Sequence, residues 1–151
     1  MDNDWLQAAG NHIIENGDDD FPELLGQIAR PPERLYVKGN IEYLHMPALA
    51  IVGSRNPTAA GRRNAFEFAR HLGGAGFCIV SGLAEGIDTA AHRGALDAGA
   101  ATIAFLGHGI DRVYPASNRD LAHEIAAHGA LVSEFPLGTH PERSLFPQRN
   151  R

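Results

Sequence analysis

After residue 46, short unbroken apolar runs alternate with longer segments in which apolar residues recur at helical spacing. Four runs predict β-strands, over residues 48–52, 77–81, 101–106 and 130–134. Three intervening segments predict α-helices, over residues 62–72, 87–98 and 119–128. A short apolar run closed by a turn of small residues is typical of a strand buried on both faces, which we expect of the first run. Strands separated by single helices predict an α/β fold with a doubly wound, mostly parallel sheet.

The first 45 residues have a different pattern, which predicts a small N-terminal helical extension packed on the main sheet. Apolar residues at helical spacing predict an amphipathic helix over residues 4–16, and residues 21–28 predict a further helical turn. Residues 35–39 predict a small strand or an edge segment. We therefore expect an adaptor over residues 1–45 and a main domain over residues 46–151.

Charge is unevenly distributed along this chain of 151 residues, whose formal net charge is −5. The first 23 residues contain seven acidic side chains and neither Lys nor Arg, so the remaining residues carry all 13 bases and a small positive balance. Twelve of those bases are Arg, whose planar guanidinium suits bidentate phosphate contacts. The acidic total therefore does not exclude a nucleic-acid ligand.

Composition excludes several classes of protein. No apolar run reaches the roughly 18 residues that a membrane span needs, and the acidic start does not resemble a signal peptide. The single cysteine, Cys78, permits no intrachain disulfide, so we expect a cytoplasmic protein with a buried core thiol. The histidines form neither an HExxH motif nor a His/Cys cluster, so no metal site is expected.

Three glycine-containing loops follow consecutive predicted strands, at residues 53–55, 81–86 and 107–109, and so share one edge of the predicted sheet. In the first loop the glycine permits close backbone approach, the serine offers a hydroxyl group and Arg55 offers a fork of donors. The second loop runs into a helix start, where backbone N–H groups and the helix dipole favour an oxygen anion. The glycines could equally serve tight strand–helix turns, but three such loops at one edge favour an anion-binding site.

Other chemical motifs are absent or weak. Neither GxGxxG after the first strand nor GxxxxGK[ST] occurs, which disfavours a dinucleotide enzyme and a P-loop NTPase. Asp88 and His92, four residues apart, are interpreted as an ordinary helix pair rather than as a base with its orienting acid. Ser81 lies outside a GxSxG elbow, so a hydrolase triad with these residues is disfavoured. Near the tail, Phe146 with Arg149 and Arg151 would stack bases and hold phosphates. Alternatively, Phe146 only anchors a proline-rich loop to the core.

Six segments, taken in order, resemble the DNA-processing protein A family (DprA/Smf). They are FPELLGQIARPPERLYVKG at 21–39, AIVGSR at 50–55, SGLAEGIDTAAHR at 81–93, GHGIDRVYPASN at 107–118, SEFPLG at 133–138 and FPQRNR at 146–151. The run SGLAEGIDTAAHRGAL is distinctive, and the resemblance covers residues 21–151.

The resemblance implies an extended Rossmann-like fold that binds single-stranded DNA and helps load the RecA recombinase in natural transformation and recombination. Family members are regarded as DNA-binding mediators without a catalytic cycle, so neither catalytic residues nor a cofactor are expected. In the family, FPxRNR is followed by the remainder of the domain and by dimer contacts, which implies that this chain is shortened and that the full-length protein is a homodimer. The resemblance implies that a DNA groove is lined by Gly53, Ser54, Arg55, Ser81, Gly82, Arg149 and Asn150. We also expect DNA or phosphate contacts from Gly107, Arg112, Asn118 and Phe146.

Two alternatives remain open at this point. One is an enzyme of the nucleoside-monophosphate phosphoribohydrolase (lysine-decarboxylase-like) group, which resembles this sheet and its loops, with Glu85, Asp88 or Glu134 as acid/base candidates. The signature of that group, Pro-Gly-Gly-x-Gly-Thr followed by a Glu pair, is absent. The other is a fragment that keeps the fold without a function, its loops occupied by sulfate or phosphate.

Overall fold

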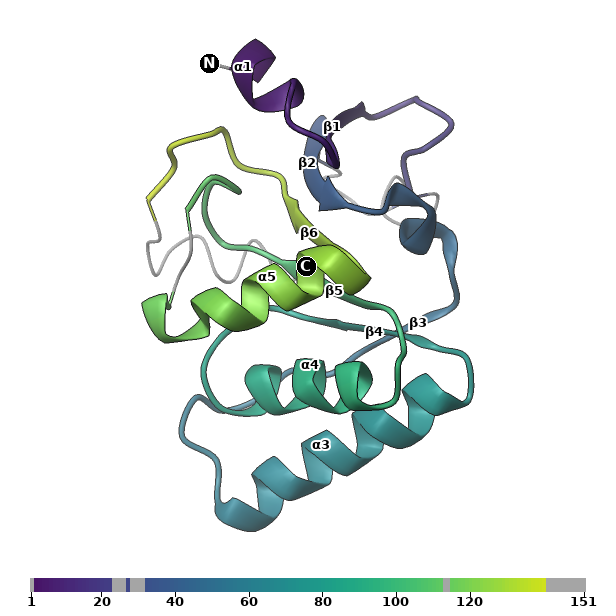
Figure 1. Ribbon diagram of the computed structural model, residues 1–151, viewed down its shortest axis with the longest axis vertical. Helices are drawn as coiled ribbons and strands as arrows, with labels where there is room; N and C mark the ends of the chain where they lie inside the picture. The colour runs from purple at the N-terminus through teal and green to yellow at the C-terminus, as the bar shows by residue number, and fades with distance from the viewer. Residues whose placement is uncertain (1, 23–26, 28–31, 113–114, 141–151) are drawn as a thin grey trace.

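Six strands form one sheet in the computed structural model, which describes residues 2–22, 27, 32–112 and 115–140 (Figure 1). The strands are β1 (Asn11–Glu15), β2 (Arg34–Gly39), β3 (Ala48–Ala50), β4 (Cys78–Ser81), β5 (Thr102–Phe105) and β6 (Ala130–Ser133). The helices are α1 (Asp2–Leu6), α3 (Ala59–Gly74), α4 (Ile87–Asp97) and α5 (Arg119–His128), with 3₁₀ turns η1 (Ile41–His45) and η2 (Ala116–Asn118). The prediction of an α/β fold with a mostly parallel sheet is confirmed, because β3, β4, β5 and β6 pair in parallel.

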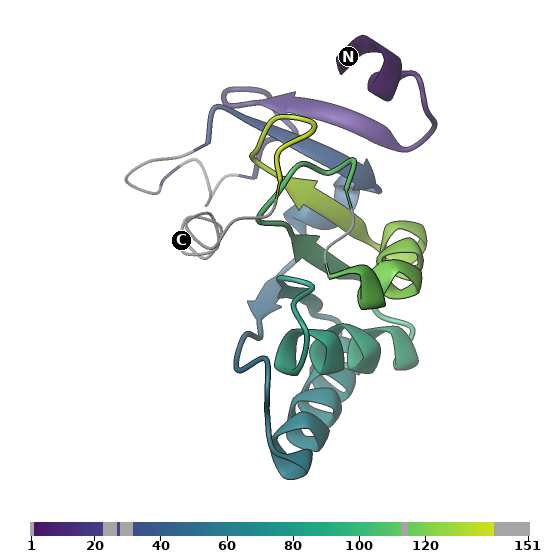
Figure 2. The ribbon, with the colours of Figure 1, turned by 90° about the vertical axis from the view of Figure 1, so that its left-hand side faces the viewer.

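The sheet has the order β1-β2-β6-β5-β4-β3, so the four parallel strands are added in one direction. Right-handed crossovers then place α3, α4 and α5 on the same face, as Figure 2 shows. Within the described residues, the opposite face is covered by η1, whose Tyr43 and Leu44 pack on a buried cluster that includes Val132. The winding therefore gives one full helical layer and a much thinner cover on the other side.

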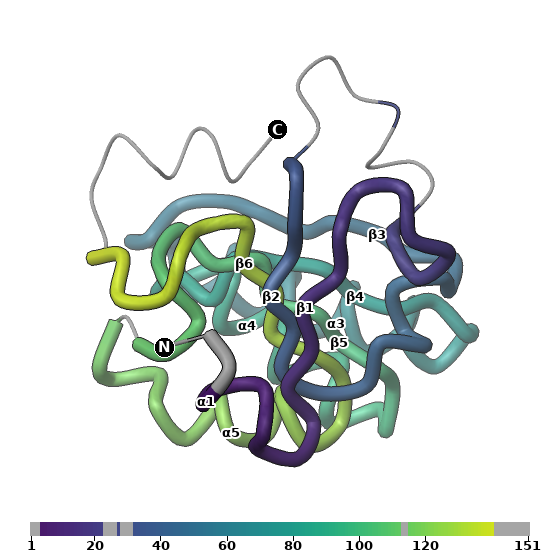
Figure 3. The backbone as a smooth tube through the Cα atoms, turned by 90° about the horizontal axis from the view of Figure 1, so that it is seen from above, coloured from purple at the N-terminus to yellow at the C-terminus, as the bar shows by residue number. Residues whose placement is uncertain are grey.

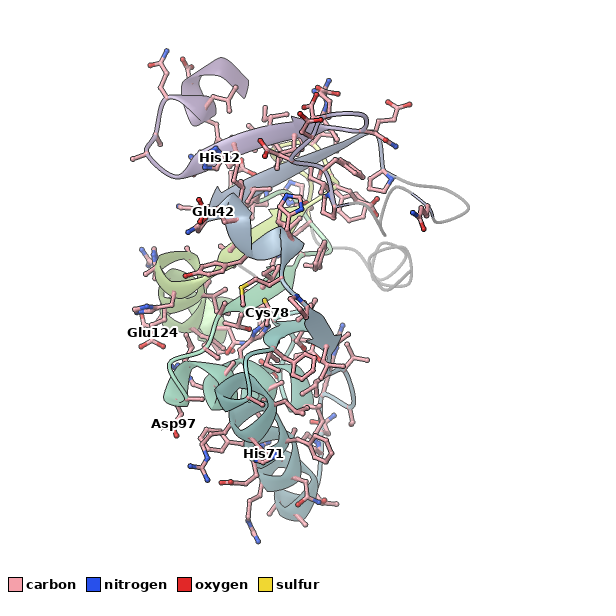
Figure 4. The ribbon with its side chains drawn as sticks, turned by 90° about the vertical axis from the view of Figure 1, so that its right-hand side faces the viewer. His12, Glu42, His71, Cys78, Asp97 and Glu124 are labelled. Carbon is pink, nitrogen blue, oxygen red and sulfur yellow. The ribbon has the colours of Figure 1, made fainter. Side chains whose placement is uncertain are left out.

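Side chains of the strands alternate between these two faces, as the pleat of a β-strand requires. Cys78 packs in the cluster beneath η1, whereas the next residue, Ile79, packs with Ala91 and Ala95 of α4. The predicted burial of the Cys78 thiol is confirmed (Figure 4), and desolvation by burial raises its pKa to about 11. The thiol is thus an apolar core group at neutral pH.

The helix predicted over residues 4–16 is wrong beyond Leu6. Gly10, at φ 83°, turns the chain, and Asn11–Glu15 then pairs antiparallel with β2. Ile13 and Ile14 face opposite sides of the sheet, each joining a different apolar cluster, so burial on both faces favours a strand there. The turn predicted at residues 21–28 lies mostly outside the described residues.

The strand predicted at residues 35–39 is confirmed, but it is an interior strand rather than an edge segment. β2 pairs with β1 on one side and with β6 on the other, and both pairings are antiparallel (Figure 3). The first residues of the chain therefore extend the same sheet that carries the loops of interest. Tyr36 of β2 also meets the Trp5 ring edge-on, with ring centroids 5.8 Å apart.

The strand predicted to be buried on both faces is instead the exposed edge of the sheet. Ala48, Leu49 and Ala50 are all exposed, and Val52 just beyond β3 is 60% exposed. Within the described residues β3 pairs only with β4, so it lacks a neighbour on its outer side. No helix of the described residues is long and apolar enough to span a bilayer.

Candidate functional site

The loops that follow β3 and β4 lie directly against each other. The backbone N–H of Ile87, at the start of α4, donates to the carbonyl oxygen of Ser54 over 3.1 Å. Gly86 has φ 84°, and a Cβ added there would lie 2.3 Å from the same carbonyl oxygen. Only glycine satisfies both demands, so Gly86 allows the two loops to pack together. The side chains of Ser54 and Arg55 remain exposed at this junction.

The loop after β4 is held from beneath by the buried carboxylate of Asp88. Its Oδ2 accepts backbone N–H groups of Gly82 and Ala84 over 3.1 and 3.3 Å. Between them Leu83 is buried at φ 63°, a backbone conformation that is strained for a branched apolar residue. A carboxylate in the first turn of α4 is also stabilised by the helix dipole. Asp88 is therefore a group that shapes this loop.

Ser81 and Gly82, both predicted to contact DNA, are buried. The hydroxyl of Ser81 donates to the carbonyl oxygen of Ile51 over 2.5 Å, which ties β4 to the end of β3. This bond shows how Ser81 positions the end of β3 before the exposed Ser54–Arg55 turn. The N–H of Gly82 is instead held by Asp88. Their direct contact with a ligand stays a prediction.

Asn118 also positions this loop. It directly precedes α5, but its side chain makes no capping bond there. The Nδ2 group instead donates to the carbonyl oxygen of Leu83 over 3.0 Å and to Oγ1 of Thr89 over 2.9 Å. The helix predicted over residues 119–128 is confirmed as α5. Asn118 connects the segment before α5 to the loop after β4.

The loop after β5 has a different environment, because its residues 107–109 are all buried. The Ser133 hydroxyl donates to the carbonyl oxygen of His108 over 2.6 Å, and the Gly109 N–H donates to Thr139 O over 2.9 Å. Arg112 is exposed and donates from Nε to Gly138 O over 3.2 Å. The predicted phosphate contacts of Gly107 and Arg112 stay predictions, and Phe146, Arg149 and Asn150 lie outside the described residues.

The candidate hydrolase residues are engaged with other groups. The Thr102 hydroxyl donates to Ile79 O over 2.7 Å, so the Nδ1–H of His92 donates to Thr102 Oγ1 over 2.8 Å. Burial lowers the pKa of His92 to about 3. The interpretation of Asp88 and His92 as a helix pair is therefore wrong, since each bonds elsewhere. A triad with the Ser81 hydroxyl is disfavoured for the same reason.

The acid/base candidates of the alternative enzyme do not gather at one point either. Asp88 is buried beneath its loop, while Glu85 is exposed and accepts the Ser117 hydroxyl over 3.2 Å. Glu134 lies half-buried just beyond β6, on the side of the loop after β5. In the described part of the chain, no cluster of three His, Cys, Asp or Glu could hold a metal ion.

A basic groove of about 830 Å³ opens next to the Ser54–Arg55 turn, between the N-terminal halves of α3 and α4. Four arginines and one carboxylate line it: Arg55, Arg62, Arg63, Arg93 and Glu85. Of the four arginines, the predicted binding site included only Arg55. A signal was present, because Arg62 and Arg63 share one stripe of the helix with Ala59 and Phe66. The sequence does not show that this stripe lines a groove, because the groove also needs the residues of α4 that lie beside it.

The fold and its loops have longer relatives among known proteins. The chain is 46% identical to Protein Smf of Synechocystis sp. over 149 residues, covering 96% of this chain and 37% of that protein. It is 39% identical to Protein Smf of Escherichia coli, covering 97% of this chain and 40% of the relative. The chain therefore spans well under half the length of these relatives.

Two solved structures have the same fold. DNA processing protein A of Streptococcus pneumoniae superimposes with a TM-score of 0.89 at 37% identity, covering 98% of this chain and 51% of that one. DNA processing protein A of Helicobacter pylori, whose single-stranded DNA binding mode its structure describes, gives a TM-score of 0.83 at 33% identity, with coverages of 93% and 62%. The DNA recombination-mediator protein A family matches residues 12–151. This chain belongs to that family.

Proposed function

We propose that this chain binds single-stranded DNA, as the DNA-contacting part of a recombination mediator. The observation that carries the proposal is the basic groove at the sheet edge, where four arginines face one carboxylate in a chain of net charge −5. The same edge carries the exposed Ser54–Arg55 turn. The single-stranded DNA binding mode of the Helicobacter pylori relative supports this choice of ligand.

Binding of this kind depends mainly on phosphate charge and only weakly on base sequence. Guanidinium groups neutralise phosphates and release counterions, so affinity falls as salt rises. About four phosphate contacts correspond to a log–log salt slope near −3 on a single strand. Bases can contribute by stacking on aromatic side chains, which tolerates any sequence. A mediator that handles arbitrary DNA requires this combination.

The first experiment titrates the chain against fluorescently labelled oligo-dT and follows anisotropy at several salt concentrations. Arg55→Ala should weaken binding by about 1.5–3 kcal/mol, by similar amounts for different sequences. Arg34→Ala is the matched control, because Arg34 is an exposed arginine of β2 that pairs with Glu15 over 3.1 Å, away from the groove. Its affinity should stay within twofold of the parent. Binding that ignores both salt and Arg55→Ala would contradict the proposal.

Contacts beyond DNA form a second part of the proposal. We infer that the full-length protein acts in the cytoplasm as a homodimer, without a catalytic cycle, and delivers single strands to a RecA-type recombinase. The family's description as a recombination mediator supports this part. A loading assay would measure recombinase filament formation on DNA coated with single-strand-binding protein. No acceleration by the full-length protein would contradict the recombinase step while leaving DNA binding intact.

A further inference from the structure

We propose that the groove between α3 and α4 is a nucleotide subsite, which takes one unstacked nucleotide of the bound strand. Its base would lie against Phe66 and its flanking phosphates at Arg62 and Arg63. The inference rests on the proposed single-stranded DNA binding and specifies where the strand goes after the Ser54–Arg55 turn. Neither α3 arginine is part of the site that the sequence predicted.

The shape of the groove follows from the way the two helices pack. At their close contact, a Cβ added at Gly94 of α4 would lie 2.2 Å from the carbonyl oxygen of Phe66. Towards their N-termini, the facing residues include Ala59 and Ala90, whose methyl groups leave the space between the helices unfilled. A volume of about 830 Å³ falls in the range of sites that bind a ligand of nucleotide size.

The charge of the groove specifies an anion. Arg62 and Arg63 are exposed, and no acidic side chain of the described residues pairs with either of them. Arg93, in contrast, is held by Glu124, and Glu85 is occupied by the Ser117 hydroxyl. The α3 pair therefore presents two guanidinium groups to an incoming phosphate.

The Phe66 ring and the charged residues beyond it determine where the subsite ends. Phe66 and Arg93 line both this groove and a second hollow of about 540 Å³. That hollow also contains Asp97 and Glu124, and Glu124 pairs with Arg93, so beyond the ring the lining no longer has an excess of arginines. A phosphate backbone finds no unpaired arginine of this lining there, which places the last seated nucleotide at Phe66. Partial burial of Phe66 fixes its ring as a stacking surface for one base.

This arrangement selects a flexible single strand over a duplex. A base reaches Phe66 only if it leaves its neighbours, which a single strand permits at low cost and a paired duplex does not. A free nucleotide would satisfy the groove chemically but would lack the adjacent phosphates for Arg55. Oligonucleotide and mononucleotide arms of the experiment distinguish these two sources of the same chemistry.

The experiment compares Arg62→Ala/Arg63→Ala with Arg70→Ala, an exposed arginine on the same helix that pairs with Glu67 over 2.7 Å and does not line the groove. Removing two phosphate contacts should weaken oligo-dT binding about tenfold and reduce the salt slope by roughly 1.4. Arg70→Ala should stay within twofold. Circular dichroism checks that each variant is folded.

A second readout reports the base itself. Oligonucleotides carrying 2-aminopurine at successive positions should show one position whose fluorescence changes more than the others on binding, because that base leaves its neighbours. Phe66→Leu should remove that difference. Unchanged affinity of the double arginine variant, with Arg55→Ala still weakening binding, would overturn the subsite and leave the proposed function standing. Absence of any binding by the parent chain would overturn both. Thymidine monophosphate that binds as tightly as oligo-dT would also overturn the subsite.

Discussion

The loops after β4 and β5 look alike in sequence but have different environments. Each follows a parallel strand, contains two glycines and was expected at the same anion-binding edge. The first meets the exposed Ser54–Arg55 turn and the basic groove, whereas residues 107–109 are buried beneath the segment that follows β6. Glycines in such loops therefore indicate a close approach, while the identity of the approaching group depends on which chain segment lies beside the loop.

In both loops a glycine is required because backbone atoms of another segment approach it closely. Gly86 faces the carbonyl oxygen of Ser54, and Gly109 faces the backbone of Pro136 and Gly138. The two contacts differ in what they position, because only the first lies beside the groove. The comparison predicts that damage to the first loop reduces DNA binding and stability together, whereas damage to the second reduces stability alone.

The largest effect is expected for Gly86→Ala. The new methyl group would lie 2.3 Å from Ser54 O at a φ of 84°, so we expect a loss of about 3 kcal/mol in the free energy of unfolding. DNA affinity should fall as well. Urea unfolding and oligo-dT titration measure the two effects. Gly74→Ala is the control, since nothing lies within 4 Å of a Cβ there, and that helical site should gain stability.

Gly109→Ala should distinguish the role of the loop after β5 from that of the loop after β4. A Cβ at this position would lie 2.8 Å from Pro136 O and 2.9 Å from the Gly138 nitrogen, so we expect a loss of about 2 kcal/mol. Affinity for oligo-dT, measured well below the unfolding midpoint, should remain within twofold of the parent. A large loss of affinity in the folded variant would show that the second loop takes part in binding and would remove the distinction.

Acid should destabilise the helix that follows the first loop. Burial lowers the pKa of His92 in the folded state from 6.5 to about 3, so the unfolded state binds its proton first as the pH falls. The stability contributed by neutral His92 is complete above pH 6.5 and decreases towards pH 3. Between pH 7.5 and pH 5 we expect a loss of about 2 kcal/mol. Unfolding of His92→Gln should depend less on pH, and an equal dependence would assign the effect to other groups.

The smallest effect is expected for Ser54→Ala. The Ser54 hydroxyl oxygen accepts the Asn56 N–H over 3.0 Å in an exposed turn, so its loss should cost about 0.5–1 kcal/mol in stability. If the hydroxyl also contacts phosphate, affinity falls more than the unfolding free energy does. Equal, small changes in both quantities would limit Ser54 to shaping the turn. Denaturant midpoints and anisotropy titrations on the same preparation decide between these outcomes.

The sequence pattern was sufficient to predict those elements whose bounds depend on residues close to them in the chain. The helix predicted over residues 87–98 is α4 at Ile87–Asp97, because its apolar spacing and flanking glycines fix both ends. The strand at residues 48–52 was misjudged, because an apolar run does not reveal whether a neighbouring strand covers it. The groove was missed for a similar reason. Arg62 and Arg63 look like solvent-facing charges until the contact at Gly94 sets α4 beside them.

The environment of Cys78 has a practical consequence for every experiment above. The chain has one cysteine, and burial both shields it and keeps its pKa near 11, so little thiolate is available at neutral pH. Maleimide or disulfide reagents should therefore spare it in the native state. A cysteine introduced at an exposed position, such as Arg70→Cys, can be labelled selectively without first removing the natural one. Dyes or cross-linkers placed in this way could follow a bound strand along α3.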